Sequence, residues 1–360
     1  MVDKLTPGDP RVQHRTFTIP GSSPPRTYHY LLASPSSSSS GPAGPRPVAT
    51  ALLVHGFPDL AFGWRYQVPF LLARGLRVIV PDMVGYGRTD APRELGAYSY
   101  RSVVEDLREL VRRVLGEAGE GEGERIVLGG HDWGGAIAWR FALWYPEMLR
   151  CVFSVCTPYF APSAAFVPRE VLVEKLLPNF GYQLQLAGPD VEAAVVGRDR
   201  IRAFLSIMYA ARASDGTGGL FSPAKGVRLD KVAEPGAVGE SPLLSKEEMD
   251  FYVGEFERNG IRGPLNWYRT HEINFAEEGP LVEQGRNRVT MPALMIVASG
   301  DVALPPAMAA GMDKYCDNLV KREVKAGHWA LWEAPVETNR HIGEFLDAIL
   351  KNKPAAKASI

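Results

Sequence analysis

One aspartate in this sequence occupies a position from which it could act as a nucleophile. The run RIVLGG (125–130) has the β-branched composition of a buried strand, and it leads through Asp132 and Trp133 into the helical run AIAWRFALWY. Asp132 therefore stands at a tight turn between a strand and a helix, with Gly130 and Gly134 two positions away on either side. Small residues there permit a strained turn that lifts the central side chain clear of the backbone. A helix-capping aspartate is the alternative, but a cap needs neither the glycines nor the upstream strand.

A carboxylate nucleophile restricts the chemistry that can follow. Its attack on an ester would give an anhydride, whereas displacement at a saturated carbon gives a stable alkyl ester. Epoxides and alkyl halides are suitable substrates for such a displacement. Water must then hydrolyse the alkyl ester by attacking the carbonyl of Asp132 itself. That step needs a base and an oxyanion hole.

Two residues in the C-terminal part of the chain are candidates for the base and for the acid that orients it. His328 lies in AGHWALWEAP, after the last strand-like run and before a C-terminal helix. Asp301 follows the strand-like run ALMIVA, and a carboxylate there could hold the imidazole in the required tautomer. The alternative is an aspartate that only opens a loop. The run CVFSVCTP (151–158) offers no carboxylate as a substitute, which favours Asp301.

Backbone N–H groups are the expected donors of the oxyanion hole. The N–H of Trp133 follows the nucleophile directly, and the N–H of Phe57 lies in HGFPD, after the first strong strand-like run. These are the positions from which a nucleophile turn receives its donors. A turn at Gly56 and Pro58 would direct the second donor, and a cis Phe57–Pro58 bond would suit that turn. His55 and Pro58 are then structural.

The elements that would position these residues alternate along the chain. Short runs rich in β-branched residues each predict a strand buried on both faces. Helical periods lie between several of them, as in residues 103–114, where apolar residues recur every three or four positions. This alternation predicts an α/β fold with a mostly parallel sheet flanked by helices. The runs are TALLVH (50–55), LRVIVP (76–81), RIVLGG (125–130), CVFSVC (151–156), ALMIVA (293–298) and LVKREV (319–324).

A long insertion interrupts the alternation. About 135 residues separate the fourth and fifth runs, far more than such units normally use for a connection. We predict a helical cap at 159–285, inserted between two parts of the core at 1–158 and 286–360, and lying over the carboxyl edge of the sheet, where such sheets bind ligands. Composition predicts no regular structure for the Ser-rich segment 34–47 or the Gly-rich segment 214–226. A plain surface loop is the expectation for the second segment, with a mobile loop over the pocket as the alternative.

The composition argues against several classes of partner. Of 360 residues, 46% are apolar, and 40 basic side chains nearly balance 41 acidic ones. Without a strong net field, we expect a small neutral molecule rather than nucleic acid or an anionic membrane as the partner. No apolar run reaches the ~20 residues of a membrane span and the N-terminus is polar, so we expect a cytoplasmic location. Three cysteines without metal-ligand spacing give no reason to predict a metal or cofactor.

The motifs together resemble those of soluble epoxide hydrolases of the α/β-hydrolase fold. The resemblance runs from about residue 50 to residue 340 in matching order, through HGFPD, GGHDWGG, the ASGD turn and GHWALWEAP. The chain order Asp132, Asp301, His328 is the one expected of nucleophile, acid and base in this fold. Of the seven histidines, His328 is the one in the position where the fold keeps its base.

Two segments of the predicted cap extend the resemblance to the substrate. FGYQLQLAGPDVEA (180–193) and IRGPLNWYRT (261–270) look like the tyrosine-bearing cap segments of that family. The resemblance implies that Tyr182 and Tyr268 polarise the epoxide oxygen, and that Gln183 and Trp133 shape the pocket. A phenol with a pKa near ~10 stays protonated at neutral pH and can donate to a more basic alkoxide. Taken alone, each tyrosine could be an ordinary packing residue.

The expected activity is therefore the conversion of epoxides to vicinal diols through a covalent ester on Asp132, with water as co-substrate. A haloalkane dehalogenase would share the nucleophile, Trp133 and the histidine step, but it lacks the paired cap tyrosines. A non-catalytic ligand receptor on the same fold would typically have lost a member of the triad. The sequence makes no prediction of the preferred epoxide or of the oligomeric state.

Overall fold

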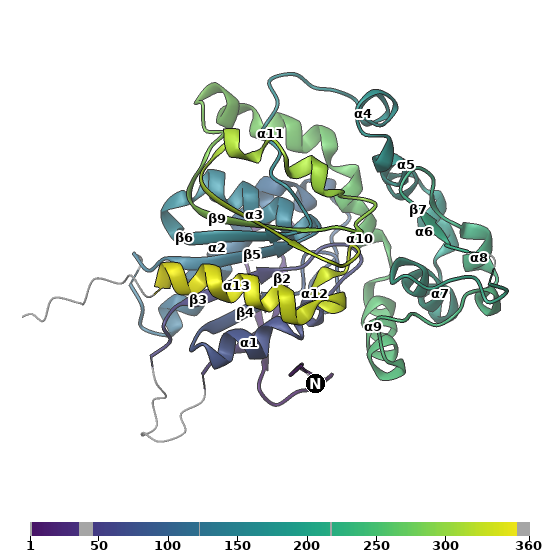
Figure 1. Cartoon of the computed structure of the whole chain (residues 1–360), viewed down its shortest axis with the longest axis horizontal. Helices are drawn as coiled ribbons and strands as arrows, with labels where there is room; N and C mark the ends of the chain where they lie inside the picture. The colour runs from purple at the N-terminus through teal and green to yellow at the C-terminus, as the bar shows by residue number, and fades with distance from the viewer. Residues whose placement is uncertain (1, 36–45, 122, 217, 351–360) are drawn as a thin grey trace, which may run out of the picture.

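An eight-stranded sheet forms the centre of the computed structural model, which describes residues 2–35, 46–121, 123–216 and 218–350 (Figure 1). The strand order is β1-β2-β4-β3-β5-β6-β9-β10. Neighbours from β4 to β10 pair in parallel, whereas β2 is antiparallel to both β1 and β4. The strands are β1 (Gln13–Thr18), β2 (Thr27–Ala33), β3 (Thr50–Val54), β4 (Arg77–Pro81), β5 (Ile126–His131), β6 (Leu149–Val155), β9 (Val289–Ala298) and β10 (Cys316–Val324).

Helices cover both faces of the sheet, as in a three-layer α/β fold (Figure 1). The helices α1, α12 and α13 lie on one face, and α2 and α3 pack together on the other. The apolar side chains of α2 recur every three or four residues and are buried, as the sequence predicts. These helices are α1 (Gln67–Ala73), α2 (Tyr100–Glu117), α3 (Trp133–Trp144), α12 (Ala330–Glu333) and α13 (Pro335–Leu350).

The strand predictions differ from the structure at the two edges of the sheet. The central strands β3, β4 and β5 are buried throughout, because helices cover both faces. The prediction that LVKREV is buried on both faces is wrong: β10 is an edge strand, and exposed positions interrupt its burial. At the other edge, β1 and β2 were not predicted, since the largely exposed QHRTFT of β1 lacks the apolar pattern of a buried strand.

The segment between β6 and β9, which we call the inserted segment, is mainly helical. Most of it extends beyond the carboxyl ends of the strands, whereas its last helix, α11, packs beside α2 over the sheet (Figure 1). It also contains a small antiparallel pair, β7 (Phe221–Ser222) with β8 (Gly226–Val227). Its helices are α4 (Arg169–Lys175), α5 (Gly181–Ala187), α6 (Asp190–Ala194), α7 (Arg198–Met208), α8 (Leu229–Ala233), α9 (Lys246–Asn259), α10 (Arg262–Asn266) and α11 (His271–Glu283).

The two segments predicted to lack regular structure have different outcomes. Residues 36–45 of the Ser-rich segment lie outside the described residues. Within the Gly-rich segment, the prediction of a plain surface loop is wrong, because this stretch forms the β7–β8 pair and Leu220 is buried. Leu220 and Phe221 are apolar residues among the glycines, and they pack inward. None of the helices in the described part of the chain has the length and apolar character needed to cross a bilayer.

Candidate active site

Asp132 lies at the turn between β5 and α3, in a conformation that side chains rarely adopt. Its φ of 54° and ψ of −126° store strain that the surrounding structure must hold. A Cβ on Gly130 would approach the Gly134 carbonyl oxygen to 2.1 Å, and a Cβ on Gly134 would approach the Val54 carbonyl oxygen to 2.0 Å. Both positions therefore require glycine. The Asp132 side chain makes no capping hydrogen bond to α3, which argues against the capping alternative.

One oxygen of Asp132 is held by the backbone, and the other is not. The Phe57 N–H donates to Asp132 Oδ1 at 2.6 Å. A Cβ on Gly56 would come within 2.3 Å of Oδ1 and within 2.6 Å of the Trp133 nitrogen, so the turn after β3 needs glycine to approach this closely. The Phe57–Pro58 peptide bond is cis, as predicted. The turn thus places Oδ1 in the expected oxyanion hole and leaves Oδ2 for other contacts.

His328 lies between the two aspartates. Its Nδ1 and Asp301 Oδ2 are 2.7 Å apart, and its Nε2 and Asp132 Oδ2 are 3.5 Å apart. Asp301 is fixed in turn, because its Oδ1 accepts from the N–H groups of Ala303 and Leu304, each at 2.9 Å. The structure therefore brings together three residues that are distant in sequence, in the relative positions of nucleophile, base and orienting acid.

The charges of this group control its protonation. Burial by itself would lower the pKa of His328, but the charge of Asp301 and the hydrogen bond to Asp132 raise that pKa well above the usual value. Burial would raise the pKa of Asp301, but the charge of His328 and the hydrogen bonds from His328, Leu304 and Ala303 lower it to about 2. In the resting site the imidazole is therefore a cation between two carboxylates.

Both predicted tyrosines come from the inserted segment and lie close to each other. Tyr182 is on α5, Tyr268 is on η6 (Trp267–Arg269), and their ring centroids are 6.2 Å apart. The Tyr268 ring also packs edge-on against Phe57 at 5.0 Å and Trp133 at 5.1 Å. Burial, with the negative charge of Asp132, raises the pKa of Tyr182, and burial also raises that of Tyr268. Both phenols therefore stay protonated at neutral pH.

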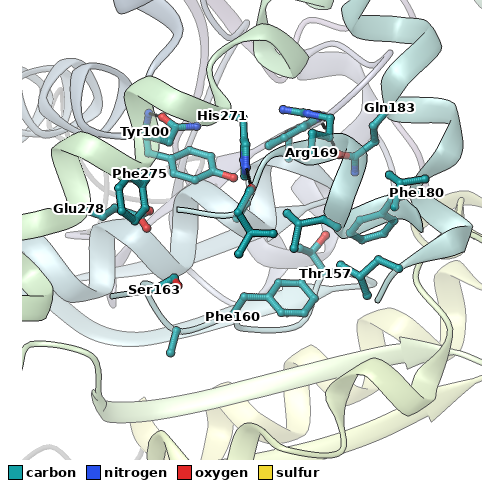
Figure 2. A pocket seen from close by; sticks show the side chains of 18 of the residues that line it. Tyr100, Thr157, Phe160, Ser163, Arg169, Phe180, Gln183, His271, Phe275 and Glu278 are labelled. Atoms are coloured by element: carbon teal, nitrogen blue, oxygen red, sulfur yellow. Dashed lines mark hydrogen bonds between the residues drawn. The ribbon is translucent and has the colours of Figure 1, made fainter. Parts of the chain in front are cut away.

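Two cavities meet at the nucleophile, since Asp132 and Tyr182 line both of them. The first, which we call the Arg169 cavity, has a volume of about 360 Å³ and includes Trp133 and Gln183 in its lining (Figure 2). The second, which we call the His328 cavity, has a volume of about 350 Å³. It is lined by Asp132, Phe57, His328, Tyr182 and Tyr268 together, so the nucleophile, the base and both phenols face one space, whereas Trp133 and Gln183 line the first cavity.

Further residues support the positions of the reactive groups. His131 bonds through Nε2 to the His328 carbonyl oxygen at 2.8 Å and so positions the loop that carries the base. The Thr157 hydroxyl donates to the Asp132 carbonyl oxygen at 2.7 Å, a support for the turn that the sequence analysis missed. His55 donates from Nδ1 to the Gly56 carbonyl and accepts the Met83 N–H at Nε2, consistent with a structural role. Such contacts join residues that are far apart in the chain, so no local sequence pattern predicts them.

Two of the three residues in a possible metal cluster near the base are already engaged in other contacts. Atoms of His131, Cys156 and His328 lie within 4.8 Å of one another. The His328 nitrogens face Asp132 and Asp301, however, and Cys156 Sγ bonds the His328 carbonyl oxygen at 3.3 Å. Burial raises the pKa of Cys156 well above its usual value, so the thiolate that a metal would need is disfavoured.

A family model and solved structures identify the structural class of this protein. A model of the alpha/beta hydrolase fold family matches residues 51–335. The solved structure of epoxide hydrolase A from Mycobacterium thermoresistibile is similar over 94% of this chain and 99% of that one, with a TM-score of 0.72 and 27% identity. An epoxide hydrolase structure from Vigna radiata gives a TM-score of 0.73 at 22% identity over the same shares, a likeness of fold alone.

Comparison with the sequences of known proteins identifies the family within this structural class. The chain is 47% identical over 354 residues to the epoxide hydrolase srdG of Neurospora crassa, a match that covers 97% of this chain and 99% of that protein. It is 35% identical over 324 residues to bifunctional epoxide hydrolase 2 of Sus scrofa, covering 87% of this chain and 53% of that protein, so it spans about half that relative's length. The chain belongs to the epoxide hydrolases of the α/β-hydrolase fold family.

Proposed function

We propose that this protein hydrolyses epoxides to vicinal diols in two steps, through an alkyl ester on Asp132. The observation that carries the proposal is the His328 cavity, in which a carboxylate, an imidazole and two phenols line one space. The carboxylate suits attack on a saturated carbon, and the phenols suit protonation of the oxygen that leaves that carbon.

In the first step, Oδ2 of Asp132 attacks a ring carbon of the epoxide. Oδ1 is already held by the Phe57 N–H, whereas Oδ2 is 3.5 Å from His328 Nε2 and is the freer oxygen. The new C–O bond forms as the ring C–O bond breaks, and the epoxide oxygen takes a proton from Tyr182 or Tyr268. Their raised pKa values keep both protons in place until an alkoxide develops.

In the second step, water attacks the Asp132 carbonyl carbon, and His328 takes the proton. The negative charge develops on Oδ1, beside the N–H groups of Phe57 and Trp133. Esterification makes this base available, because Asp132 loses the charge and hydrogen bond that raise the pKa of His328 in the resting site, so the imidazolium returns a proton to the phenolate formed in the first step. Asp301 remains to orient the ring and to stabilise the imidazolium. The bond between the carbonyl carbon and Oδ2 then breaks, and the leaving oxygen takes the second proton of the attacking water. The diol is released, and the site returns to an Asp132 carboxylate beside a protonated His328.

A single turnover in isotopically labelled water tests the route. One oxygen of Asp132 is replaced by an oxygen from water each time the ester is hydrolysed, so heavy oxygen should appear in the Asp132 peptide. Its absence there, with label in the diol, would mean that water attacks the epoxide directly and would overturn the ester route. Styrene oxide is a suitable first substrate. Halide release from haloalkanes without diol from styrene oxide would instead indicate a dehalogenase.

We propose further that residues 159–285 act as a cap domain between two parts of a catalytic core, 1–158 and 286–360. Tyr182, Tyr268 and Gln183 all come from this cap, whereas Asp132, Asp301, His328 and Phe57 come from the core. The partners in the reaction are then a small epoxide and water. A cytoplasmic location stays a prediction, which fluorescence microscopy of a tagged chain would test.

A further inference from the structure

A hairpin in the inserted segment packs against the helix that carries Tyr182. We call residues 220–227 the hairpin, which includes the paired strands β7 and β8. Figure 1 shows β7 beside α5, and β8 contacts the same helix. Leu220 and Val227, at the two ends of the hairpin, are buried although glycines surround them in the sequence. The hairpin is therefore a packed element with a fixed place next to α5.

The helix α5 depends on contacts from outside itself. It has seven residues and no side-chain cap at its N-terminus, and a helix of this length is marginal on its own. The N–H groups of its first turn have no partner within the helix. The hairpin supplies one, because the Pro223 carbonyl accepts the Tyr182 N–H at 2.8 Å. The hairpin therefore fixes the backbone of this tyrosine.

Gln185 joins α5 to the hairpin through its side chain. Its Nε2 donates to the Val227 carbonyl at 2.9 Å, and its Oε1 accepts the Val227 N–H at 2.8 Å. A Cβ on Gly181 would come within 2.1 Å of the Ala224 carbonyl oxygen, and a Cβ on Gly226 would come within 2.1 Å of Gln185 Oε1. Both positions need glycine for this close approach, so α5 and the hairpin are fitted to each other.

The side chain of Tyr182 also contacts the hairpin. Its ring packs edge-on against Phe221 with 5.5 Å between the ring centroids, and both rings line the His328 cavity. Tyr268 is held differently, since its ring packs against Phe57 and Trp133 of the core. The two phenols therefore have different supports, one in the hairpin and one in the core.

We propose that the hairpin positions Tyr182 to donate to the epoxide oxygen, and that Gln185 is the positioning residue that joins the two. The inference rests on the proposed function, in which this phenol is a proton donor. Donation depends on distance and direction, and a displacement of about 1 Å can cost on the order of 100-fold in rate. Loosening the hairpin should therefore slow ester formation. It should not slow ester hydrolysis, because Asp132, His328 and the Phe57 N–H belong to the core.

The test is a single turnover of styrene oxide by excess protein, with mass spectrometry of the Asp132 peptide at successive times. The rise of the modified peptide gives the rate of ester formation, and its decay gives the rate of hydrolysis. In Gln185→Met, which keeps the length of the side chain without its amide, formation should slow by about 10-fold and hydrolysis should stay within about 2-fold of the wild type. Equal slowing of both steps, or no slowing of formation, would overturn the proposal.

A double-mutant cycle checks that the effect passes through Tyr182. In the Tyr182→Phe background the hydroxyl is absent, so Gln185→Met should slow ester formation by no more than about 2-fold. In the Tyr268→Phe background Tyr182 is the remaining donor, and Gln185→Met should slow formation by about 10-fold or more. A slowing of about 10-fold in the Tyr182→Phe background would overturn the proposal, because Gln185 would then act on another part of the site.

Two further variants test the contact itself. Gly226→Ala acts from the hairpin side, since its Cβ would displace the Gln185 amide, and it should slow formation without slowing hydrolysis. It also replaces Gln185→Met if circular dichroism shows that variant to be misfolded. Arg228→Met is the matched control, because Arg228 directly follows the hairpin but its exposed charge pairs with Asp230. Both rates should stay at the wild-type values in this control. Unchanged formation in Gly226→Ala, or slowed formation in Arg228→Met, would overturn the role of the Gln185 contact.

Amide exchange separates this proposal from the proposed function. The hydrogen bond to the Pro223 carbonyl protects the Tyr182 N–H, so deuterium uptake by peptides spanning residues 180–187 should be faster in Gln185→Met than in the wild type. Faster uptake supports the positioning of Tyr182 by the hairpin even if styrene oxide leaves no ester on Asp132, an outcome that would overturn the proposed function alone. Unchanged uptake, with ester formed in the wild-type protein, would overturn the positioning role alone.

Discussion

The core half and the inserted half of the site are held by different forces. In the core, Asp132, Asp301 and His328 are fixed by a strained turn and by hydrogen bonds of 2.6 to 2.9 Å to backbone or to each other. In the inserted segment, the tyrosine side chains are fixed mainly by ring packing, and the Tyr182 hydroxyl accepts a long hydrogen bond of 3.5 Å from Gln183 Nε2.

This difference follows from what each half must do. Nucleophile and base have to meet at one carbonyl carbon, and small displacements of such groups are costly for the rate. The phenols only have to donate to an oxygen whose position changes with the substrate. Packing holds their rings but leaves their hydroxyl hydrogens available. We therefore expect single changes in the core half to abolish activity, and single changes in the inserted half to reduce it.

The largest effect is expected for Asp132→Ala. Without a nucleophile no ester can form, and kcat/KM should fall by roughly 10⁴-fold or more. Diol formation from styrene oxide measures the loss, and circular dichroism checks that the fold is kept. Activity within about 100-fold of the wild type would mean that the phenols and His328 suffice for direct attack by water, and the comparison of the two halves would fail.

His328→Gln should stop the reaction between its two steps. Asp132 remains able to attack, but no base activates the water, so turnover should fall by about 10³-fold or more while the ester accumulates. Mass spectrometry of the Asp132 peptide after mixing should show the added mass of the substrate. As a control, His271→Gln changes a histidine whose Nε2 bonds the Val167 carbonyl away from the triad, and it should accumulate no ester. Steady multiple turnover by His328→Gln would exclude His328 as the base.

Tyr182→Phe and Tyr268→Phe should each lower kcat/KM by about 10- to 100-fold, because either phenol can still donate when the other is lost. The double variant should lose more than the product of the single losses, since no donor remains. Tyr252→Phe is the control, as this tyrosine of α9 bonds Asp59 and does not line either cavity. If the loss of kcat/KM in the double variant equals the product of the two single losses, the two phenols act independently of each other, unlike the residues of the triad.

The pH dependence should separate the two steps. In the alkyl-enzyme His328 must be neutral to accept a proton, so kcat should rise with pH through the pKa that His328 has once Asp132 is esterified. On the alkaline side, kcat/KM should not fall before the tyrosines ionise, which their raised pKa values place above about pH 10. Steady-state rates across this range measure both limbs. A kcat that decreases as pH rises from about 6 to 8 would contradict the role of His328.

The smallest effect concerns the contact between the two halves. The carboxyl of Asp59 in the core accepts the Tyr252 hydroxyl at 2.6 Å, and burial raises the pKa of Asp59 to about 7. An acid with a raised folded-state pKa keeps its proton while the unfolded chain loses it, so stability decreases as pH rises from about 4 to about 7.

Asp59→Asn should abolish this pH dependence. The free energy of unfolding of the wild-type protein should fall by about 1 to 3 kcal/mol over this range because of Asp59, and that of the variant should lack this fall. Denaturant titrations at the two ends of this range provide the measurement. An identical pH dependence in the variant and the wild type would show that Asp59 is ionised in the folded protein.

The sequence was most informative where chemistry and local structure coincide. The turn at Asp132 needs a strand, two glycines and a helix within about ten residues, and all of these can be read from neighbours in the chain. The buried central strands were predicted for the same reason. The edge strand β1 and the β7–β8 pair were not predicted, and the burial of the edge strand β10 was predicted wrongly. The side chains of these strands are only partly buried, and partners distant in the sequence decide their burial.

By itself, the sequence determined the type and chain order of the reactive groups and, with the tyrosine-bearing segments, the family to which the chain belongs. Only the tertiary structure decided which oxygen of Asp132 is held by Phe57 and that His328 lies between two carboxylates. It also decided that Arg140 has an ionic partner in Glu278, whereas Arg169 of the same cavity contacts the neutral Gln183. The physical reason is that the strain of a turn is set by adjacent residues, whereas charge compensation depends on which distant side chains the fold brings together.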